Sequence, residues 1–475
     1  MRPNLLLLTD SYKVSHWRQY PPNTQTIYSY LESRGGKWSD TVFFGLQYIL
    51  KEYLHHPYNP LFTKGNIDYA AQRMEQHLGP GLFNKEGWEY IYDKHDGRLP
   101  VSIWAIPEGT PVPTGHPLVV ICNTDPKCYW LTNYLETLLM QLWYPCTVAT
   151  QSREMKHLIT KYLMKTQGNA DSIDFKLHDF GFRGVSSCES AGLGGMAHLI
   201  NFKGTDTMAA IEYASYYYGA DMAGFSIPAS EHSTITSWGR EDEILAYKNM
   251  LEAYPTGIVA CVSDSFNIFE ACRMWGRYPL RDMILERDGT LVIRPDSGDP
   301  IQVLVTGNEN VMDILWGEFG GTISDKGYKL LNNKIRVIQG DGVNIESIDA
   351  ILYAMQQRGY SAENIAFGSG GALLQQLNRD TQKMAFKCSA IERDGRWQEV
   401  FKDPITDHGK QSKRGLVTTF KSDTGGFYTV NETSFMGRGK DDDQTRTWKP
   451  AMVEVFRDGK IMKEYTFDEV RANAY

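Results

Sequence analysis

The chain has 475 residues, of which 42% are hydrophobic and 22% charged, and it contains 11 Trp, 27 Tyr and 20 Phe. A chain with so many aromatic side chains to bury is not intrinsically disordered, and its length suits two or three domains or one large barrel with additions. The formal charge of −8 at pH 7 argues against a protein whose main task is to coat nucleic acid.

We expect neither a membrane anchor nor a secretion signal. The apolar run Leu5–Leu8 is followed at once by polar residues, and it is too short for a signal-peptide core or a membrane span. The seven cysteines form no CxxC pair, which is typical of reduced thiols rather than of disulfides or a zinc site. We therefore predict a cytoplasmic protein without membrane or nucleic-acid partners.

The first 150 residues predict a mixture of helices and strands. Helices are expected near Phe44–Tyr53 and Asn66–His77, and a β-rich stretch over Val101–Cys122. A further helix is predicted over Tyr129–Pro145 and should stop at Pro145, because proline interrupts a helix.

One pattern recurs from about residue 175 to residue 385. A short apolar run ends abruptly in Gly, Asp, Ser or His, and a helix-like stretch usually follows, which predicts a parallel sheet with crossover helices. Six candidate strands end in this way: Phe175–Gly184, Gly224–Thr234, Gly257–Ser265, Leu291–Gly298, Ile335–Gly342 and Ile365–Gly371. Helices are predicted near residues 191–199, 241–254 (with Ser233 or Thr234 as a cap), 267–275 and 345–357.

The last 85 residues are rich in strand and turn signals again. We therefore predict an α/β fold with two domains. Residues 1–150 together with 390–475 would form a mixed α+β domain, and residues 151–389 a barrel-like catalytic domain. Ligands bind at the carboxyl ends of the strands in barrels and open α/β sheets, so we expect the site there.

Two glycine-rich turns follow neighbouring predicted strands. Gly368–Gly371 leads directly into a helix, and Gly340–Gly342 lies one strand earlier. Exposed backbone N–H groups at such turns bind phosphate, although a tight turn with positive φ explains either motif alone. Neither turn has the Gly-Lys-Ser/Thr ending of a P-loop, and the dinucleotide fingerprint is absent.

Polar and aromatic side chains mark other strand ends. Arg294 and Asp296 are two residues apart and can point the same way, to hold an anion and its metal, or a ribose diol, unless they form an ordinary surface ion pair. His232 suits an acid, a base or a phosphate donor, although a lone histidine is more often structural. Phe180 can stack on a flat ring or simply pack in the core, and Arg183 can hold a phosphate or an amide oxygen.

A run of cations lies toward the C-terminus. Such runs usually form a solvated face, but beside phosphate-binding turns they can gather a highly charged anion. The cations are Arg379, Lys383, Lys387, Lys402, Lys410, Lys413 and Arg414.

Many of these motifs, in this order, resemble the nicotinamide phosphoribosyltransferases. The resemblance runs from about Leu5 to the C-terminal TFDEVRANA, and it is carried by LLTDSYKVSHWRQYPPNT, TDPKCYWLTNYLET, HDFGFRGVSS, NFKGTDT, SEHSTIT, IRPDSG, VIQGDGV, FGSGGALLQ, AFKCS and FKDP. It implies an irregular α/β barrel of the type II phosphoribosyltransferases with a second domain. It also implies transfer of phosphoribose from 5-phosphoribosyl 1-diphosphate to nicotinamide, with Mg²⁺, in a homodimer with shared active sites.

The resemblance also implies residue roles. Phe180 and the partner subunit's Tyr12 would stack on the pyridine, Asp206 would accept from the carboxamide, and Arg183 would contact the base. His232, supported by Asp264, would be phosphorylated by ATP, whose hydrolysis drives the reaction. The remaining implied residues bind the ribose, phosphate and diphosphate: Arg294, Asp296, Gly340, Asp341, Gly370, Gly371, Arg379, Lys387, Asp10, Arg34, Lys402 and Lys410. The sequence departs from the family at Ala385, where a serine is usual.

Two other functions stay open at this point. A nicotinate phosphoribosyltransferase shares the fold, but the carboxylate of Asp206 favours an amide substrate and repels the carboxylate of nicotinic acid. A non-catalytic binding protein on the same fold is the second alternative, and the intact set of predicted site residues disfavours it.

Overall fold

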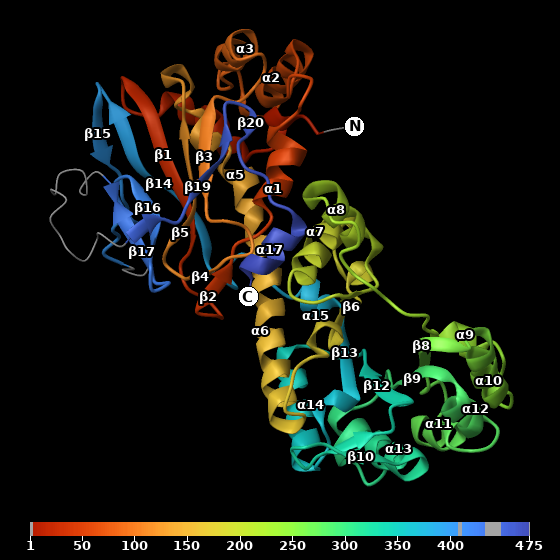
Figure 1. The fold of residues 1–475 in the computed structure, drawn as a ribbon. Coiled ribbons are helices and arrows are strands. Elements are labelled where there is room, and N and C mark those ends of the chain that lie inside the picture. The colour runs from red at the N-terminus through yellow and green to blue at the C-terminus, as the bar shows by residue number, and fades with distance from the viewer. Residues whose placement is uncertain (1–2, 407–410, 433–447, 475) are drawn as a thin grey trace. The chain divides into compact units, whose positions relative to one another are not determined.

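The computed structural model describes residues 3–406, 411–432 and 448–474. The chain divides into two compact units (Figure 1). Unit 1 comprises Met1–Thr150, Tyr216–Ala220 and Asn378–Tyr475, and unit 2 comprises Gln151–Ser215 and Asp221–Leu377.

Unit 1 is built on a seven-stranded sheet in the order β15-β14-β1-β5-β3-β19-β20. Its two longest strands, β1 (Thr24–Ser33) and β14 (Met384–Arg393), pair antiparallel, with Tyr30 opposite Lys387. This pairing joins segments more than 350 residues apart. The other strands are β3 (Val101–Ala105), β5 (Pro117–Asn123), β15 (Arg396–Glu399), β19 (Val453–Arg457) and β20 (Lys460–Ile461). Smaller sheets pair β2 (Asp40–Val42) with β4 (Pro111–Pro113), and β16 (Val417–Ser422) with β17 (Phe427–Asn431) and β18 (Trp448–Pro450).

Local signals in the sequence account for the start and the buried face of α2. In α2 (Lys64–Leu78), Thr63 and Asn66 cap each other's backbone, and Ile67, Ala70 and Met74 form the buried stripe. The α-helices are α1 (Leu46–Ile49), α2, α3 (Lys85–Lys94), α4 (Leu131–Tyr134), α5 (Glu136–Leu139) and α17 (Phe467–Asn473). Tighter or wider helical turns are η1 (Leu5–Leu7), η2 (Ser11–Arg18), η3 (Leu50–Leu54), η4 (Pro126–Cys128) and η5 (Met140–Leu142).

The prediction of one helix that stops at Pro145 is wrong. Residues 131–142 form the short helices α4, α5 and η5, and α6 (Trp143–Thr166) begins just before the proline. Pro145 therefore lies in the first turn of α6, where the missing N–H has no intrahelical partner to lose. Among the described residues, α6 included, no helix is long and apolar enough to cross a membrane.

Unit 2 contains a six-stranded sheet in the order β7-β6-β13-β12-β9-β8, and every neighbouring pair is parallel. The strands are β6 (Leu177–Asp179), β7 (Gly204–Thr205), β8 (Thr256–Val262), β9 (Asp288–Arg294), β12 (Ile335–Gln339) and β13 (Ile365–Ser369). A hairpin of β10 (Gly321–Ile323) and β11 (Lys329–Leu331) lies outside this sheet. The predicted α/β class with a parallel sheet is confirmed.

Helices connect the strands of unit 2, as the sequence predicts. They are α7 (Cys188–Leu199), α8 (Met208–Tyr218), α9 (His232–Thr236), α10 (Glu243–Ala253), α11 (Ile268–Trp275), α12 (Leu280–Glu286), α13 (Val311–Phe319), α14 (Ile345–Gln357) and α15 (Gly371–Leu374). Shorter or π-type turns are η6 (Ile173–Phe175), η7 (Phe182–Gly184), η8 (Gln302–Thr306) and η9 (Ala362–Asn364). The predicted cap is wrong, because Glu231 precedes α9 and Asp242 precedes α10.

The candidate strand Gly224–Thr234 is not a regular strand. It makes two isolated bridges, Phe225 to Gly204 in β7 and Ala229 to Ala260 in β8. Pro228 has no N–H to donate, which prevents a continuous ladder. Because β7 and β8 are the two edges of the sheet, this segment links both edges and gives an irregular barrel in place of an open sheet.

Candidate functional site

A cavity of about 820 Å³ lies at the carboxyl ends of the strands of unit 2. This is the end at which the sequence predicts a site, because side chains and turns that follow parallel strands meet at one edge. Ten of the predicted residues line the cavity together: Phe180, Arg183, Asp206, His232, Arg294, Asp296, Gly340, Asp341, Gly370 and Gly371. Phe182, Thr207 and Glu231 also line it, and the sequence did not single them out.

The two glycine turns are adjacent in this cavity. Gly370 and Gly371 follow β13, Gly340 and Asp341 follow β12, and the two strands pair directly. A hydrogen bond from the Ser369 hydroxyl to the carbonyl of Val343, at 2.7 Å, ties the two turns together. Backbone groups of both turns are thus held at one wall of the cavity, as a phosphate site requires.

Phe180 is seated by close backbone packing. A Cβ atom on Gly368 would lie 1.9 Å from the Phe180 ring, so only glycine leaves room for the ring there. The Phe180 N–H donates to the carbonyl of Ser369 at 2.9 Å. Asp206 lines the same cavity, and its carboxylate accepts a short hydrogen bond from the Ser226 hydroxyl. A flat aromatic face and a carboxylate acceptor therefore share one compartment.

Arg294 connects the aromatic and the acidic parts of the cavity. Its Nη2 and Nε atoms donate to one oxygen of Asp296, at 2.8 and 3.2 Å. Its guanidinium lies 5.5 Å from the centre of the Phe180 ring, a distance at which a cation is attracted to a ring. The alternative of an ordinary surface ion pair is disfavoured, because Arg294 is partly buried and faces the cavity.

His232 and Asp264 form a hydrogen-bonded pair. Nε2 of His232 lies 2.9 Å from Oδ1 of Asp264, whose side chain is 3% exposed. The second oxygen of Asp264 accepts from the Asp296 N–H at 3.0 Å and from the Ser297 hydroxyl at 2.5 Å. Asp264 therefore joins the histidine to the Arg294–Asp296 loop, and Nδ1 of His232 faces the carboxylate of Asp296 at 4.0 Å.

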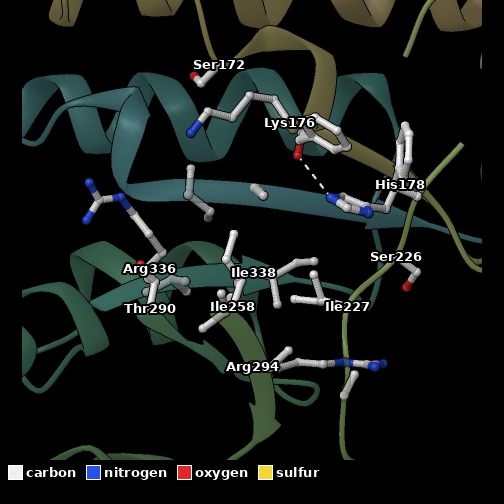
Figure 2. A pocket seen from close by; sticks show the side chains of 18 of the residues that line it. Ser172, Lys176, His178, Ser226, Ile227, Ile258, Thr290, Arg294, Arg336 and Ile338 are labelled. Atoms are coloured by element: carbon white, nitrogen blue, oxygen red, sulfur yellow. Dashed lines mark hydrogen bonds between the residues drawn. The ribbon is translucent and has the colours of Figure 1, made fainter. Parts of the chain in front are cut away.

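A second cavity of about 590 Å³ shares Phe180, Asp206 and Arg294 with the first and is lined mostly by apolar side chains of the sheet. Figure 2 shows Lys176 and Arg336 toward one end of it and Ser226 and Arg294 toward the other. Lys176 bonds the carbonyl of Glu363 at 2.9 Å, and burial lowers its pKa to about 8 while the charge of Glu363 opposes that change.

The sequence analysis gave no role to Lys176 or His178, although the alternation of side chains along β6 carries a signal for both. Lys176, His178 and Phe180 alternate along one face of the strand, and all three line the second cavity. Burial lowers the pKa of His178, whose Nε2 lies 3.0 Å from the carbonyl of Phe175.

Asp179, between His178 and Phe180, is a fully buried carboxyl. Burial is the main cause that raises its pKa to about 6; the Gly181 N–H and the Thr207 hydroxyl lower it, and the charge of Asp206 raises it. Its Oδ2 and the Oγ1 of Thr207 are both buried, and neither atom makes a hydrogen bond of regular geometry among the described residues. An ionised Asp179 is therefore costly for the folded chain.

This cost predicts a pH-dependent stability difference between the wild type and Asp179→Asn. The pKa of Asp179 is higher in the folded chain than in the unfolded chain. The free energy of unfolding of the wild type therefore falls as the pH rises from about 4 to about 6, by on the order of 3 kcal/mol at most. The asparagine variant does not ionise, so its melting temperature should gain on that of the wild type over this range. Thermal unfolding from pH 4 to 8 measures the difference, and a difference that stays constant with pH contradicts the assignment.

The predicted residues of unit 1 include a cluster of cations. Burial lowers the pKa of Lys387, and the charges of Arg34, Lys13 and Lys402 lower it further against that of Glu136. Arg34 pairs with Glu32 at 3.0 Å and Lys13 with Glu136 at 2.6 Å. Cations that crowd a partly buried lysine in this way favour an anionic ligand. Lys13 was not predicted from the sequence.

The other predicted residues of unit 1 lie outside this cluster or outside the described residues. Asp10 accepts from the Thr137 hydroxyl at 2.8 Å, Tyr12 is 58% exposed, and Arg379 pairs with Asp380 at 3.4 Å. Lys410 lies outside the described residues. Ala385 stands opposite Glu32 in the ladder between β1 and β14.

The cavity has no metal cage made by protein side chains alone. Within the described ranges, the one group of three or more close His, Cys, Asp or Glu side chains is His95, Asp125 and Cys128, in unit 1. The cavity does offer the carboxylates of Asp296 and Asp341. One or two carboxylates suit an Mg²⁺ ion that takes its remaining ligands from phosphate and water.

Comparisons with known proteins identify the relatives of this chain. Residues 175–459 match the model of the nicotinate phosphoribosyltransferase (NAPRTase) family, and residues 4–103 match the N-terminal domain of nicotinamide phosphoribosyltransferase. A nicotinamide phosphoribosyltransferase of Xanthomonas campestris is 50% identical over 99% of this chain and 98% of its own, and one of Acinetobacter baylyi is 33% identical over 99% and 97%.

Solved structures share the fold at low identity. A nicotinate-nucleotide pyrophosphorylase of Pyrococcus furiosus covers 99% of this chain and 95% of its own with a TM-score of 0.59, and human nicotinic acid phosphoribosyltransferase covers 98% and 93% with 0.55; both are 15% identical. The fold is that of the type II phosphoribosyltransferases. The chain belongs to the nicotinate phosphoribosyltransferase family and, within it, to the nicotinamide phosphoribosyltransferases.

Proposed function

We propose that this protein transfers the 5-phosphoribosyl group from 5-phosphoribosyl 1-diphosphate to nicotinamide, and so forms nicotinamide mononucleotide and diphosphate for NAD salvage. The observation that carries the proposal is the single cavity that combines Phe180, Asp206, Arg294 and the two glycine turns. It supplies a face for a flat ring, an acceptor for an amide, and groups suited to a sugar phosphate. The relatives named nicotinamide phosphoribosyltransferase support the same activity.

The base is held by two contacts of different kinds. Phe180 stacks on the pyridine ring, and the carboxylate of Asp206 accepts a hydrogen bond from the amide nitrogen, with Arg183 nearby. Ser226 bonds Asp206 and so orients its carboxylate. An amide offers N–H donors to this carboxylate, whereas the carboxylate of nicotinic acid is repelled.

The reaction needs charge stabilisation more than a covalent catalyst. As the bond from ribose C1 to the diphosphate breaks, positive charge grows on the sugar and negative charge on the leaving group. Arg294 and Asp296 contact the ribose and its phosphates, and the backbones of Gly340, Asp341, Gly370 and Gly371 receive the 5-phosphate. Mg²⁺ fits beside Asp296 and Asp341, where it would neutralise charge on the diphosphate.

The leading test is product formation with each base. Purified protein with 5-phosphoribosyl 1-diphosphate, Mg²⁺ and nicotinamide should give nicotinamide mononucleotide by mass spectrometry, and nicotinic acid should give far less of its mononucleotide. Stronger use of nicotinic acid would assign the protein to the nicotinate enzymes, and no product with either base would favour the non-catalytic alternative.

The variant Asp206→Ser should weaken the preference for the amide. Removal of the carboxylate abolishes both the attraction for the amide N–H and the repulsion of nicotinic acid, so the ratio of kcat/KM values for the two bases should fall at least tenfold. Competition kinetics with both bases measures this ratio. The control is Asp174→Ser, which removes a carboxylate of the same unit that lines neither cavity. An unchanged ratio in Asp206→Ser would exclude the role of Asp206 in the choice of base.

Coupling to ATP extends the proposal to His232. The Nε2 atom is held by Asp264, which leaves Nδ1 as the nitrogen to accept a phosphoryl group. In the transfer a bond forms between Nδ1 and the γ-phosphorus of ATP, the bond from that phosphorus to the bridging oxygen breaks, and ADP leaves. The carboxylate of Asp264 stabilises the positive charge that develops on the ring.

We also propose a cytoplasmic homodimer with shared active sites. The cluster of Lys13, Arg34, Lys387 and Lys402 is suited to a diphosphate. In the dimer these cations, with Asp10, Arg379 and Lys410, would serve the diphosphate bound by the other chain. The partner subunit's Tyr12 would cover the second face of the pyridine.

A further inference from the structure

The carboxyl of Asp179 is buried on the side of β6 that faces away from the cavities. Lys176, His178 and Phe180 line the second cavity, and the alternate residue Asp179 projects toward the helices. A Cβ atom on Gly195 of α7 would lie 2.8 Å from Oδ2 of Asp179 and 2.7 Å from Cβ of Ala210 in α8. The helix layer therefore leaves just enough space for this carboxyl, and Asp179 is not among the residues that line either cavity.

The contacts of Asp179 lead to the two groups proposed to hold the base. Its Oδ1 accepts from the Gly181 N–H at 2.7 Å, in the turn that follows Phe180. Its main-chain carbonyl accepts from the Asp206 N–H at 2.9 Å. The side chain thus fixes the turn after Phe180, while the backbone of the same residue fixes the start of the segment that carries Asp206.

The turn requires an acceptor at position 179 but does not require a charge. Asparagine or serine can accept the same Gly181 N–H, as both commonly do in tight turns. A buried carboxyl is the more costly choice at this position. The side chain of Asp179 reaches the turn that follows Phe180, and the carbonyl of the same residue reaches Asp206, so this one position contacts both base-binding segments.

We propose that Asp179 is a positioning residue for base recognition, which sets the Phe180 ring and the Asp206 carboxylate at the separation and angle that suit nicotinamide. This inference rests on the proposed function, because Phe180 and Asp206 act on the base only there. It concerns the acceptor at Oδ1, so a neutral side chain of the same shape should serve nearly as well.

The test compares Asp179→Ala with Asp179→Asn in steady-state kinetics. Asp179→Ala should raise the KM for nicotinamide at least tenfold, leave the KM for 5-phosphoribosyl 1-diphosphate within twofold, and reduce the preference for nicotinamide over nicotinic acid at least fivefold. Asp179→Asn should keep all three within threefold of the wild type. The matched control is Glu108→Ala, which removes another buried carboxyl. Glu108 accepts the Gly45 and Gln47 N–H groups in unit 1. This variant should lower the melting temperature without raising the KM for nicotinamide relative to the KM for 5-phosphoribosyl 1-diphosphate.

Two results would overturn the inference. The first is an Asp179→Ala variant in which both KM values rise together or only kcat falls, as for a general loss of structure. The second is an Asp179→Asn variant whose KM for nicotinamide rises as much as that of Asp179→Ala. If Asp179→Ala does not fold, Asp179→Ser replaces it. This variant should raise the KM for nicotinamide alone, about threefold, since the shorter serine hydroxyl is a weaker acceptor. An equal rise in both KM values would again overturn the inference. A wild type that makes no nicotinamide mononucleotide would instead overturn the proposed function.

Discussion

Arg294→Lys should lower kcat/KM for nicotinamide mononucleotide synthesis by 100-fold to 1000-fold, about 3 to 4 kcal/mol in the barrier. The planar guanidinium donates through two nitrogens to Asp296 while it lies 5.5 Å from the Phe180 ring centre. Lysine keeps the positive charge but has no planar fork, so it cannot make the forked contact to Asp296 and present a flat face to the ring at the same time. The ribose phosphate and the base compartment should therefore both lose alignment.

The control for this variant is Arg358→Lys. Arg358 also pairs with an aspartate in unit 2, Asp313 at 2.8 Å, but it is half-exposed and lines neither cavity. Its kcat/KM should stay within twofold of the wild type. Initial rates at several concentrations of both substrates measure the effect, and an Arg294→Lys variant within threefold of the wild type would show that charge alone, without guanidinium geometry, is sufficient.

The parts of the site that the sequence predicts are those set by local pattern. An apolar run followed by Gly368–Gly371 and then by a helix specifies strand, turn and helix within about ten residues, and the structure has β13, the turn and α15 there. Because such units stack in parallel, their carboxyl ends meet without any further information. Ten predicted residues accordingly line one cavity.

The parts that the sequence does not predict depend on distant partners. The segment 224–234 reads as a strand, but its pairing is decided by Gly204 and Ala260 on two different edges. Lys13 joins the cations around Lys387 through tertiary packing of η2. The motif that contains it gave roles to Asp10 and Tyr12 but none to Lys13. The side chains of Lys176 and His178 lie on one face of the strand, as the alternation along a strand requires. The side chains inside a small barrel are expected to be apolar, so these two polar residues were not predicted to line a cavity. The particular base and the phosphorylation expected at His232 were inferred from resemblance to a family, since spacing alone left His232 with several roles.

His232→Ala should abolish labelling of the protein by ATP that carries ³²P in its γ-phosphate. Nδ1 of His232 is the proposed acceptor, and the variant has no nitrogen in its place. The rate of nicotinamide mononucleotide synthesis with ATP should then equal the rate of the same variant without ATP, whereas the wild type should be faster with ATP. Asp264→Asn should reduce labelling at least tenfold, because the amide lacks the negative charge that stabilises the imidazolium and can hold the wrong tautomer.

The matched control is His157→Ala, which removes a half-exposed histidine of α6 in the same unit and should label like the wild type. The label on the wild type should be lost in acid and survive in alkali, as a phosphorus–nitrogen bond requires, and it should be discharged when nicotinamide and 5-phosphoribosyl 1-diphosphate are added. Labelling of His232→Ala at the wild-type level would place the phosphoryl group on another residue. A wild type with equal rates with and without ATP would remove energy coupling. It would leave the transfer reaction intact, because the roles proposed for Phe180, Asp206 and Arg294 do not depend on the histidine.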